Sequence, residues 1–219
     1  MKIYLIPGLG YTHRIYEKMS LNDFDVTYLN WIEPKRNETI QNYAKRLFKD
    51  LPKTNEKIVL IGHSFGGIIS QVIAEYQSIN TIILLSSIQS RIEMPLFFKM
   101  VKPFRFYHFF TKEISIKTVK YWGENHGFET EKERELFSEM VGSYSNNYLQ
   151  WALKTLSNWQ TPNISKTTKI VQIHGTNDKT FPIQFIKNAD VIIEDGSHVM
   201  VYKQSEKIRD VIIQQLKQP

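Results

Sequence analysis

The sequence predicts a three-layer α/β/α sandwich with a mostly parallel sheet. Short apolar runs alternate along the 219 residues with segments of helix length, which is typical of strands linked by helices. These apolar runs are continuous rather than alternating, which indicates strands that are buried on both faces. A chain of this length can bury a sizeable core, so residues 1–219 are expected to form one domain.

Strands are expected where short apolar runs end at turn residues. The first run stops at Pro7-Gly8 and the third stops at Gly62, and both residue types commonly end strands. The second run is less apolar than the others. The expected strands are Lys2–Ile6, 26–31, 58–61, Thr81–Leu85, 169–173 and 189–193.

Helices are expected between these strands, at 39–51, 68–76 and 199–216. In 39–51 apolar residues recur at spacings of three and four, and Pro52 closes the segment. The apolar positions are Ile40, Tyr43, Ala44, Leu47, Phe48 and Leu51.

The stretch between Ser86 and Lys169 contains no convincing strand and is rich in aromatic and helix-like sequence. About 80 residues between two strands are too many for a plain loop. We therefore expect residues 88–166 to form a helical cap over the open end of the sheet.

The strand at 58–61 runs directly into Gly62-His63-Ser64-Phe65-Gly66, after which a helix is expected. G-x-S-x-G between a strand and a helix is the pattern of a nucleophile elbow. Glycines two residues either side of the serine leave room for its strained turn. The pattern predicts that Ser64 is a catalytic nucleophile; the alternative is a glycine-rich turn in a non-catalytic protein.

A serine hydroxyl needs a general base within hydrogen-bond reach. Asp178 follows the strand at 169–173, and His198 follows the strand at 189–193 and precedes the last helix. Working residues of open α/β sheets lie on such loops. We expect His198 to act as the base and Asp178 to orient it, although either residue could instead be an ordinary turn or capping residue.

Other residues compete for these roles. Asp195 is a rival acid, but it lies only three positions before His198 and would need an awkward return path. His63 is expected to position neighbouring loops, because successive side chains diverge on an elbow. The remaining histidines lack suitable placement: His174 at a strand end, His13 near the first loop and within reach of a substrate, and His108 and His126 in the cap.

Acyl transfer generates an oxyanion, which two preorganised amides can stabilise. The Phe65 amide at the start of a helix is one candidate, and the Leu9 amide in Pro7-Gly8-Leu9-Gly10 is the other. A plain turn or a phosphate loop is the alternative for the latter. No G-x-x-x-x-G-K-[ST] sequence is present, and no G-x-G-x-x-G follows Gly8, so nucleotide binding gains no support.

Taken together, PGLG, GHSFGG, HGTNDKTFP and GSHVM resemble the α/β-hydrolase superfamily, in its esterase and acyl-hydrolase branches. These pieces extend from Pro7 to Met200 in the expected order. The resemblance implies a Ser64-Asp178-His198 triad and an oxyanion hole from Leu9 and Phe65. Pro7 stands where the first loop usually carries histidine, and the early start of the chain implies a shorter sheet of about six strands.

The expected reaction is cleavage of a carboxylic ester or thioester through an acyl-enzyme, with no metal and no organic cofactor. Three alternatives stay open. They are a thioesterase or methyl ester esterase acting on a carrier-bound acyl chain, a cofactor-free perhydrolase, and a non-catalytic ligand-binding protein on a hydrolase scaffold.

The expected cap carries more aromatic surface than a short helix pair needs. The rings either pack the cap on the sheet or line an apolar acyl pocket. Four basic residues interleave with them and could steer an anionic thioester or acyl-carrier substrate. The aromatic residues are Phe97, Phe98, Phe104, Phe106, Tyr107, Phe109 and Phe110, and the basic ones are Lys99, Lys102, Arg105 and Lys112.

Amino-acid composition excludes several kinds of site and partner. The absence of cysteine excludes disulfides, a thiol nucleophile and cysteine-ligated metals. The net charge of +6 reflects a lysine excess or attraction to an acidic partner, but the basic residues are too scattered to favour nucleic acid. No signal peptide and no membrane span are apparent, so the cytoplasm is the expected location.

Overall fold

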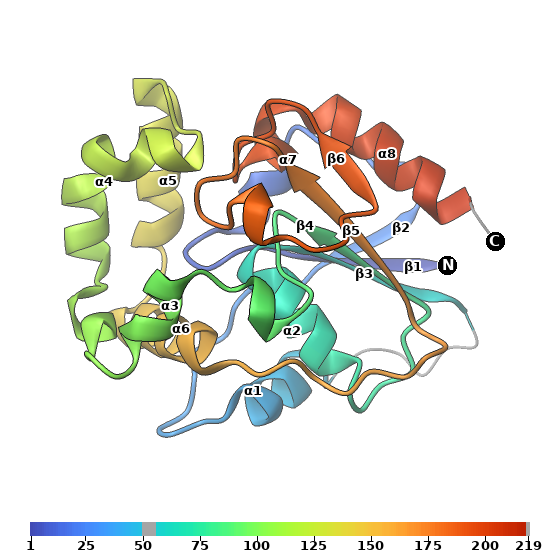
Figure 1. Ribbon diagram of the computed structural model, residues 1–219, viewed down its shortest axis with the longest axis horizontal. Helices are drawn as coiled ribbons and strands as arrows, with labels where there is room; N and C mark the ends of the chain where they lie inside the picture. Colours follow the sequence, from blue (N-terminus) through green and yellow to red (C-terminus); the bar gives the residue numbers. More distant parts are fainter. Residues whose placement is uncertain (50–55, 218–219) are drawn as a thin grey trace.

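The computed structural model describes residues 1–49 and 56–217, and it has the predicted three-layer α/β fold (Figure 1). One sheet has the strand order β2-β1-β3-β4-β5-β6, and every neighbouring pair is parallel. The prediction of a mostly parallel, six-stranded sheet is therefore confirmed. The strands are β1 Lys2–Ile6, β2 Asp25–Tyr28, β3 Ile58–His63, β4 Thr81–Leu85, β5 Lys169–Gly175 and β6 Val191–Ile193.

The central strands are buried because their aliphatic side chains are covered on both faces. In β3 and β4 every residue after the first is buried, whereas the less apolar β2 lies mostly exposed at one edge. The register places Leu5 beside Ile61, and Ile61 beside Ile83, so that one apolar row crosses three strands. This row explains why the continuous apolar runs predicted strands so well.

Helices cover both faces of the sheet (Figure 1). α1 and α2 lie on one face and α8 on the other, while the short α7 follows β6. The predicted helix at 39–51 corresponds to α1, whose first turn is capped by the Thr39 side chain; Leu51 and Pro52 lie outside the described residues. These helices are α1 Ile40–Leu47, α2 Phe65–Ile73, α7 Met200–Lys203 and α8 Ser205–Lys217.

Residues 88–166, between β4 and β5, contain helices and no strand, and we call them the helical insertion. Side-chain caps explain where three of its helices begin: Thr111, Thr130 and Ser145 each accept a hydrogen bond from the first turn. Its elements are η2 Arg91–Glu93, α3 Leu96–Val101, η3 Phe106–Phe109, α4 Lys112–His126, α5 Glu131–Gly142 and α6 Asn146–Asn158. Two further short 3-10 helices, η1 His13–Tyr16 and η4 Ile183–Phe185, lie in loops outside it.

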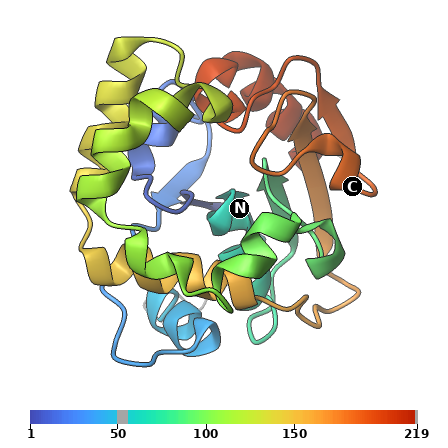
Figure 2. The ribbon, with the colours of Figure 1, turned by 60° about the vertical axis from the view of Figure 1, so that its left-hand side comes forward.

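The insertion lies beside the end of the sheet at which the strands finish, as Figure 1 and the turned view of Figure 2 show. It is attached there by hydrogen bonds to three separate loops. The Tyr144 hydroxyl donates to Tyr11 O at 2.9 Å, and the Trp151 indole donates to Glu38 O at 2.8 Å. The Val199 amide donates to His126 O at 3.2 Å. That residues 88–166 act as a distinct cap stays a prediction.

Candidate active site

Ser64 sits on the sharp turn between β3 and α2. Its backbone has φ 51° and ψ −119°, a strained conformation for a residue other than glycine. The Ser64 amide donates to Leu85 O at 2.9 Å, which fixes the turn to β4. The residue is only 6% exposed, and its hydroxyl lies within hydrogen-bond distance of His198.

The two glycines of G-x-S-x-G are required by close backbone contacts. A Cβ atom on Gly66 would lie 2.1 Å from Ile6 O, and one on Gly62 would lie 2.4 Å from the Gly67 nitrogen. Both distances are far shorter than van der Waals contact. The elbow therefore packs directly against the end of β1, which brings the loop after β1 next to Ser64.

His198 and Asp178 complete a hydrogen-bonded series with Ser64. His198 Nε2 lies 3.0 Å from Ser64 Oγ, while His198 Nδ1 lies 2.9 Å from Asp178 Oδ2. An ionised carboxylate only accepts hydrogen bonds, so Nδ1 carries the proton and Nε2 can accept from the serine hydroxyl. The structure thus brings together the three residues that the sequence singled out, from loops after β3, β5 and β6.

The Asp178 carboxylate is held by its own loop. Its Oδ1 accepts hydrogen bonds from the Thr180 amide at 2.8 Å and the Phe181 amide at 2.9 Å. Burial alone raises the pKa of this carboxyl, but the charge and hydrogen bond of His198, with the Phe181 amide, lower the pKa below its ordinary value. The rival acid Asp195 is exposed; its carboxylate accepts a hydrogen bond from the Asn177 side chain, and its backbone amide donates to the Thr176 hydroxyl.

Three further histidines surround His198. His63 Nε2 donates to His198 O at 2.9 Å, which agrees with the predicted positioning role, and His174 Nε2 donates to Phe181 O at 2.7 Å. The His126 ring meets the His198 ring edge-on at 5.7 Å. Burial, followed by the charge of His198, lowers the pKa of His63 to about 3 and that of His126 to about 4. Burial also lowers the pKa of His174, so all three are neutral at pH 7.

The remaining two histidines lie elsewhere. His13 is exposed and contacts the Tyr28 ring at 5.6 Å, and His108 is exposed in η3. Neither contacts Ser64, so the interpretation that His13 could touch a substrate gains no support from the geometry.

The expected oxyanion donors lie at two adjoining chain segments. Phe65 is the first residue of α2, and the loop Gly8–Tyr11 forms a turn closed by the Tyr11 amide and Gly8 O at 3.1 Å. A Cβ atom on Gly8 would lie 3.1 Å from Ser64 Cβ, so this turn begins against the nucleophile. Within 1–49 and 56–217 neither the Leu9 amide nor the Phe65 amide has a hydrogen-bond partner. That these two amides form an oxyanion hole stays a prediction.

Sequence reasoning missed two aromatic residues that hold the site. Tyr16 donates to Ile6 O at 2.7 Å and accepts from the His63 amide at 3.1 Å. The Trp31 indole donates to Gly8 O at 3.0 Å. Trp31 was expected only as the end of a strand, and no local pattern distinguishes Tyr16 from other buried tyrosines. Their contacts join segments far apart in the sequence.

Replacing Tyr16 by phenylalanine should lower the free energy of unfolding by about 1–3 kcal/mol, because Ile6 O and the His63 amide would lose a buried partner. Urea unfolding of the purified variant measures this change. The exposed Tyr121→Phe variant is the control and should be unchanged. A Tyr16→Phe protein as stable as wild type would show that the two hydrogen bonds of the Tyr16 hydroxyl do not stabilise the fold.

The buried His63 should make the fold sensitive to acid. Its pKa is about 3 when folded against an ordinary value of 6.5, so below pH 6.5 the unfolded chain binds a proton that the folded chain does not. The contribution of neutral His63 to the free energy of unfolding is complete above pH 6.5 and is lost as the pH falls toward 3. We expect about 2 kcal/mol to be lost between pH 7 and 5.

Urea unfolding at pH 7 and at pH 5 tests this expectation. His63→Gln, which can still donate a hydrogen bond, should lose less stability than wild type over the same interval, whereas the exposed His108→Gln should behave as wild type. Parallel pH dependence in all three proteins would show that His63 does not carry the effect.

A family model described as "PGAP1-like alpha/beta domain" matches residues 35–203 of the chain. The match includes Ser64, Asp178 and His198 but not the loop that carries Leu9. No curated protein matches the chain significantly.

Several solved structures share the fold at low sequence identity. An esterase (EaEST) from Exiguobacterium antarcticum has a TM-score of 0.78 at 16% identity, covering 100% of this chain and 92% of that one. A bromoperoxidase from Bacillus anthracis has a TM-score of 0.75 at 14% identity, covering 99% and 92%. MenH from S. aureus has a TM-score of 0.72 at 16% identity, covering 99% and 93%. At these identities the likeness establishes the fold alone.

Proposed function

Because the chain belongs to the PGAP1-like alpha/beta domain family, within the α/β-hydrolase superfamily, we propose that it is a serine hydrolase that cleaves a carboxylic ester or thioester. One observation carries the proposal. Ser64 Oγ, the His198 ring and the Asp178 carboxylate form an unbroken hydrogen-bonded series behind a strained elbow. A serine, a base and an oriented acid in this order make up the machinery of nucleophilic acyl transfer.

In the proposed reaction, His198 Nε2 removes the proton of the Ser64 hydroxyl as its oxygen attacks the acyl carbonyl. Asp178 keeps the Nδ1 proton in place and stabilises the positively charged imidazolium that forms. The lowered pKa of the Asp178 carboxyl supports this role, since the group is ionised at neutral pH. The neutral His63, His126 and His174 add no competing positive charge.

The tetrahedral intermediate places a negative charge beside the elbow, and we assign its stabilisation to the Leu9 and Phe65 amides. Each donor of this kind contributes roughly 10²–10³ in rate in known acyl-transfer enzymes. His198 then gives its proton to the leaving alcohol or thiol, and an acyl-Ser64 ester remains. Water attacks that ester with His198 as base, which releases the acid and restores the serine.

Reaction with a fluorophosphonate probe tests the proposal directly, because the probe phosphonylates only an activated serine. Wild type should be labelled, and Ser64→Ala, with an intact fold by circular dichroism, should not. A series of p-nitrophenyl esters of increasing acyl length then measures which acyl chains the site accepts. Absence of labelling in folded wild type would reject the proposal in favour of a binding protein on the same scaffold.

Two further assays distinguish the open alternatives. A thioesterase should turn over acyl thioesters faster than oxygen esters of the same chain length. In a solution that contains bromide, a perhydrolase should brominate a phenol only when hydrogen peroxide and a carboxylic acid are both supplied, because the peracid formed from them oxidises the bromide.

A further inference from the structure

The segment from Leu96 to Phe109 carries a row of apolar side chains that face solvent. Leu96 is 70% exposed, Phe97 66% and Phe109 67%. Phe104 and Phe106 are also exposed, and their rings stack on one another at 5.7 Å. We call this set, with Met100 and the basic residues Lys99, Lys102, Arg105 and Lys112, the aromatic–basic surface.

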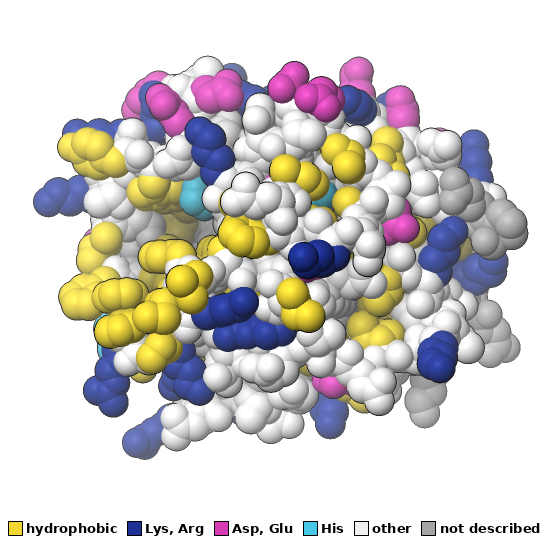
Figure 3. All heavy atoms as spheres, in the orientation of Figure 1, with side chains coloured by type: hydrophobic (Ala, Val, Ile, Leu, Met, Phe, Trp, Pro, Cys, Tyr) yellow, Lys and Arg dark blue, Asp and Glu magenta, His cyan; other side chains and the backbone are white. Residues whose placement is uncertain are grey.

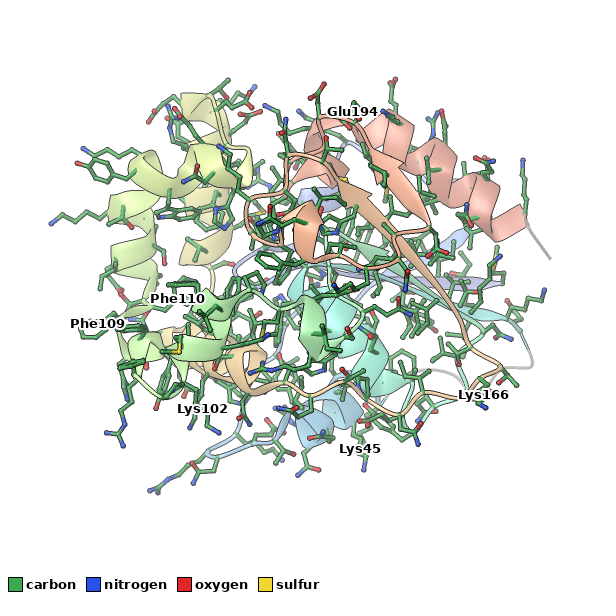
Figure 4. All side chains as sticks on the ribbon, viewed as in Figure 1. Lys45, Lys102, Phe109, Phe110, Lys166 and Glu194 are labelled. Atoms are coloured by element: carbon green, nitrogen blue, oxygen red, sulfur yellow. The ribbon has the colours of Figure 1, made fainter. Side chains whose placement is uncertain are left out.

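This exposure is not explained by packing of the insertion on the sheet. Phe98 and Phe110 do turn inward and pack on the core, so the segment already supplies the rings that anchor it. Figure 4 shows Phe109 at the outer edge of the molecule, and Figure 3 shows hydrophobic side chains gathered over the region of α3 and α4. An exposed apolar patch of this kind marks an interaction site.

The charge around the patch is mainly positive because, of the two acidic residues that flank it, Glu93 is buried and the exposed Glu113 accepts a hydrogen bond from Asn146. Residues 94–112 include four lysines and arginines but no aspartate or glutamate. Lys154 of α6 adds a further positive charge, with its amine 5.5 Å from the centre of the Tyr107 ring. Lys102 and Arg105 are exposed, and Figure 3 shows basic side chains beside the hydrophobic cluster. A negatively charged partner would therefore complement this surface.

A second copy of the chain does not fit. A two-fold contact through this surface would bring its basic residues close to those of the second copy, and like charges would oppose association. Phenylalanine and leucine side chains that protrude among lysine and arginine match the composition of segments that lie in a membrane interface. None of the helices in the described ranges has the length and apolar character for crossing a bilayer.

We propose that the aromatic–basic surface docks this protein on an anionic lipid bilayer. The phenyl rings enter the boundary between headgroups and acyl chains, and the cations contact the acidic headgroups. Each basic residue near a charged leaflet adds an electrostatic attraction that salt weakens. Insertion of the phenyl rings is not weakened by salt.

The docking surface is connected to the candidate active site by packed rings. Phe97 meets Phe98 at 5.5 Å, Phe98 meets Phe181 at 5.4 Å, and Phe181 meets His198 at 5.7 Å. A docked molecule would hold Ser64 and His198 close to the lipid. If the proposed serine hydrolase activity holds, on which this step rests, the substrates are esters of long acyl chains drawn from the bilayer.

Flotation with vesicles tests docking separately from catalysis, because it can use Ser64→Ala protein that turns nothing over. The protein should float with phosphatidylcholine vesicles containing phosphatidylglycerol and should remain at the bottom with phosphatidylcholine alone. High salt should weaken the binding. Flotation without fluorophosphonate labelling of wild type would reject the hydrolase and keep the docking surface, and the reverse result would do the opposite.

Matched variants locate the surface. Lys102→Glu with Arg105→Glu should weaken vesicle binding by about 30-fold or more, whereas Lys166→Glu with Lys207→Glu changes the net charge equally and should have far less effect. Phe109→Ser should weaken binding about fivefold, and the exposed Ile192→Ser should not. All four substitution sets lie on the surface, and thermal melting confirms that each protein is folded.

Three results would overturn the proposal. They are no flotation with any vesicle, equal flotation with neutral and anionic vesicles, and equal loss in the two charge-reversal pairs. Binding of an acidic acyl carrier protein through Lys102 and Arg105, with no binding to vesicles, would also overturn it and would assign the surface to a protein partner.

Discussion

Replacing Ser64 by alanine should lower kcat for a p-nitrophenyl ester by about 10⁴–10⁶-fold, because the acyl-enzyme can no longer form. The substitution removes one oxygen from a side chain that is nearly buried and should leave the fold intact. Steady-state kinetics with active-site titration of the wild type measures the loss. Residual activity within tenfold of wild type would mean that another group performs the chemistry.

Substitutions of His198 and Asp178 test the same assignment further, because the effects of replacing residues that act as a unit are not additive. His198→Ala should be as damaging as Ser64→Ala, and the double variant should be no worse than either. Asp178→Asn should lower kcat about 10⁴-fold, because the amide can donate to Nδ1 and so favour the wrong imidazole tautomer. The exposed Asp195→Asn is the control and should retain wild-type activity. Equal losses at Asp178 and Asp195 would reject the assignment of the acid.

The core of the fold could be predicted because its signals are local. β1 and β4 have the predicted bounds, since both are aliphatic runs that end at turns. The elbow could be located because G-x-S-x-G is a local pattern with fixed spacing. Glycine is needed at position 66 because Ile6 O approaches its backbone so closely that a Cβ atom would not fit. Ser64, Asp178 and His198 could be proposed together because each follows a strand, and parallel strands finish at one edge.

The last predicted helix illustrates where local patterns fail. The segment 199–216 was expected to be continuous, but it forms α7 and α8, with Gln204 between them at φ −121° and ψ 39°. The break falls in the polar run 203–207, where no apolar residue reports the periodicity, so the pattern alone does not reveal it.

The insertion could be predicted only in outline. Helical character was evident, but the direction of each ring was not, because Phe97 and Phe98 are neighbours with the same chemistry and only the second packs on the core. Its contacts with Tyr11, Glu38 and Val199 join residues that are far apart in the chain. The same reason hides Tyr16 and Trp31, whose roles depend entirely on distant carbonyl and amide groups.

Replacing Gly66 by alanine should remove most of the stability of the domain, by about 5 kcal/mol or more. The new Cβ would lie 2.1 Å from Ile6 O and 2.5 Å from Pro7 O, and both are backbone atoms that side-chain rotation cannot move away. Either the elbow or the end of β1 must shift, and the apolar row through β1 and β3 would be disturbed. Urea unfolding and the yield of folded protein measure the effect.

Alanine substitutions at two other glycines serve as comparisons for this prediction. Gly8→Ala should cost less than Gly66→Ala, because the atoms nearest to its Cβ, at 2.8 and 2.9 Å, belong to the His63 and Tyr11 side chains. Gly142→Ala, at the end of α5, meets only Ile116 Cδ1 at 3.7 Å and should be neutral or stabilising by up to about 1 kcal/mol. The expected order of stability is therefore Gly142→Ala, Gly8→Ala and Gly66→Ala. A Gly66→Ala protein as stable as Gly142→Ala would mean that the elbow does not press on β1 as closely as described, and the reason for glycine after the nucleophile would fall with it.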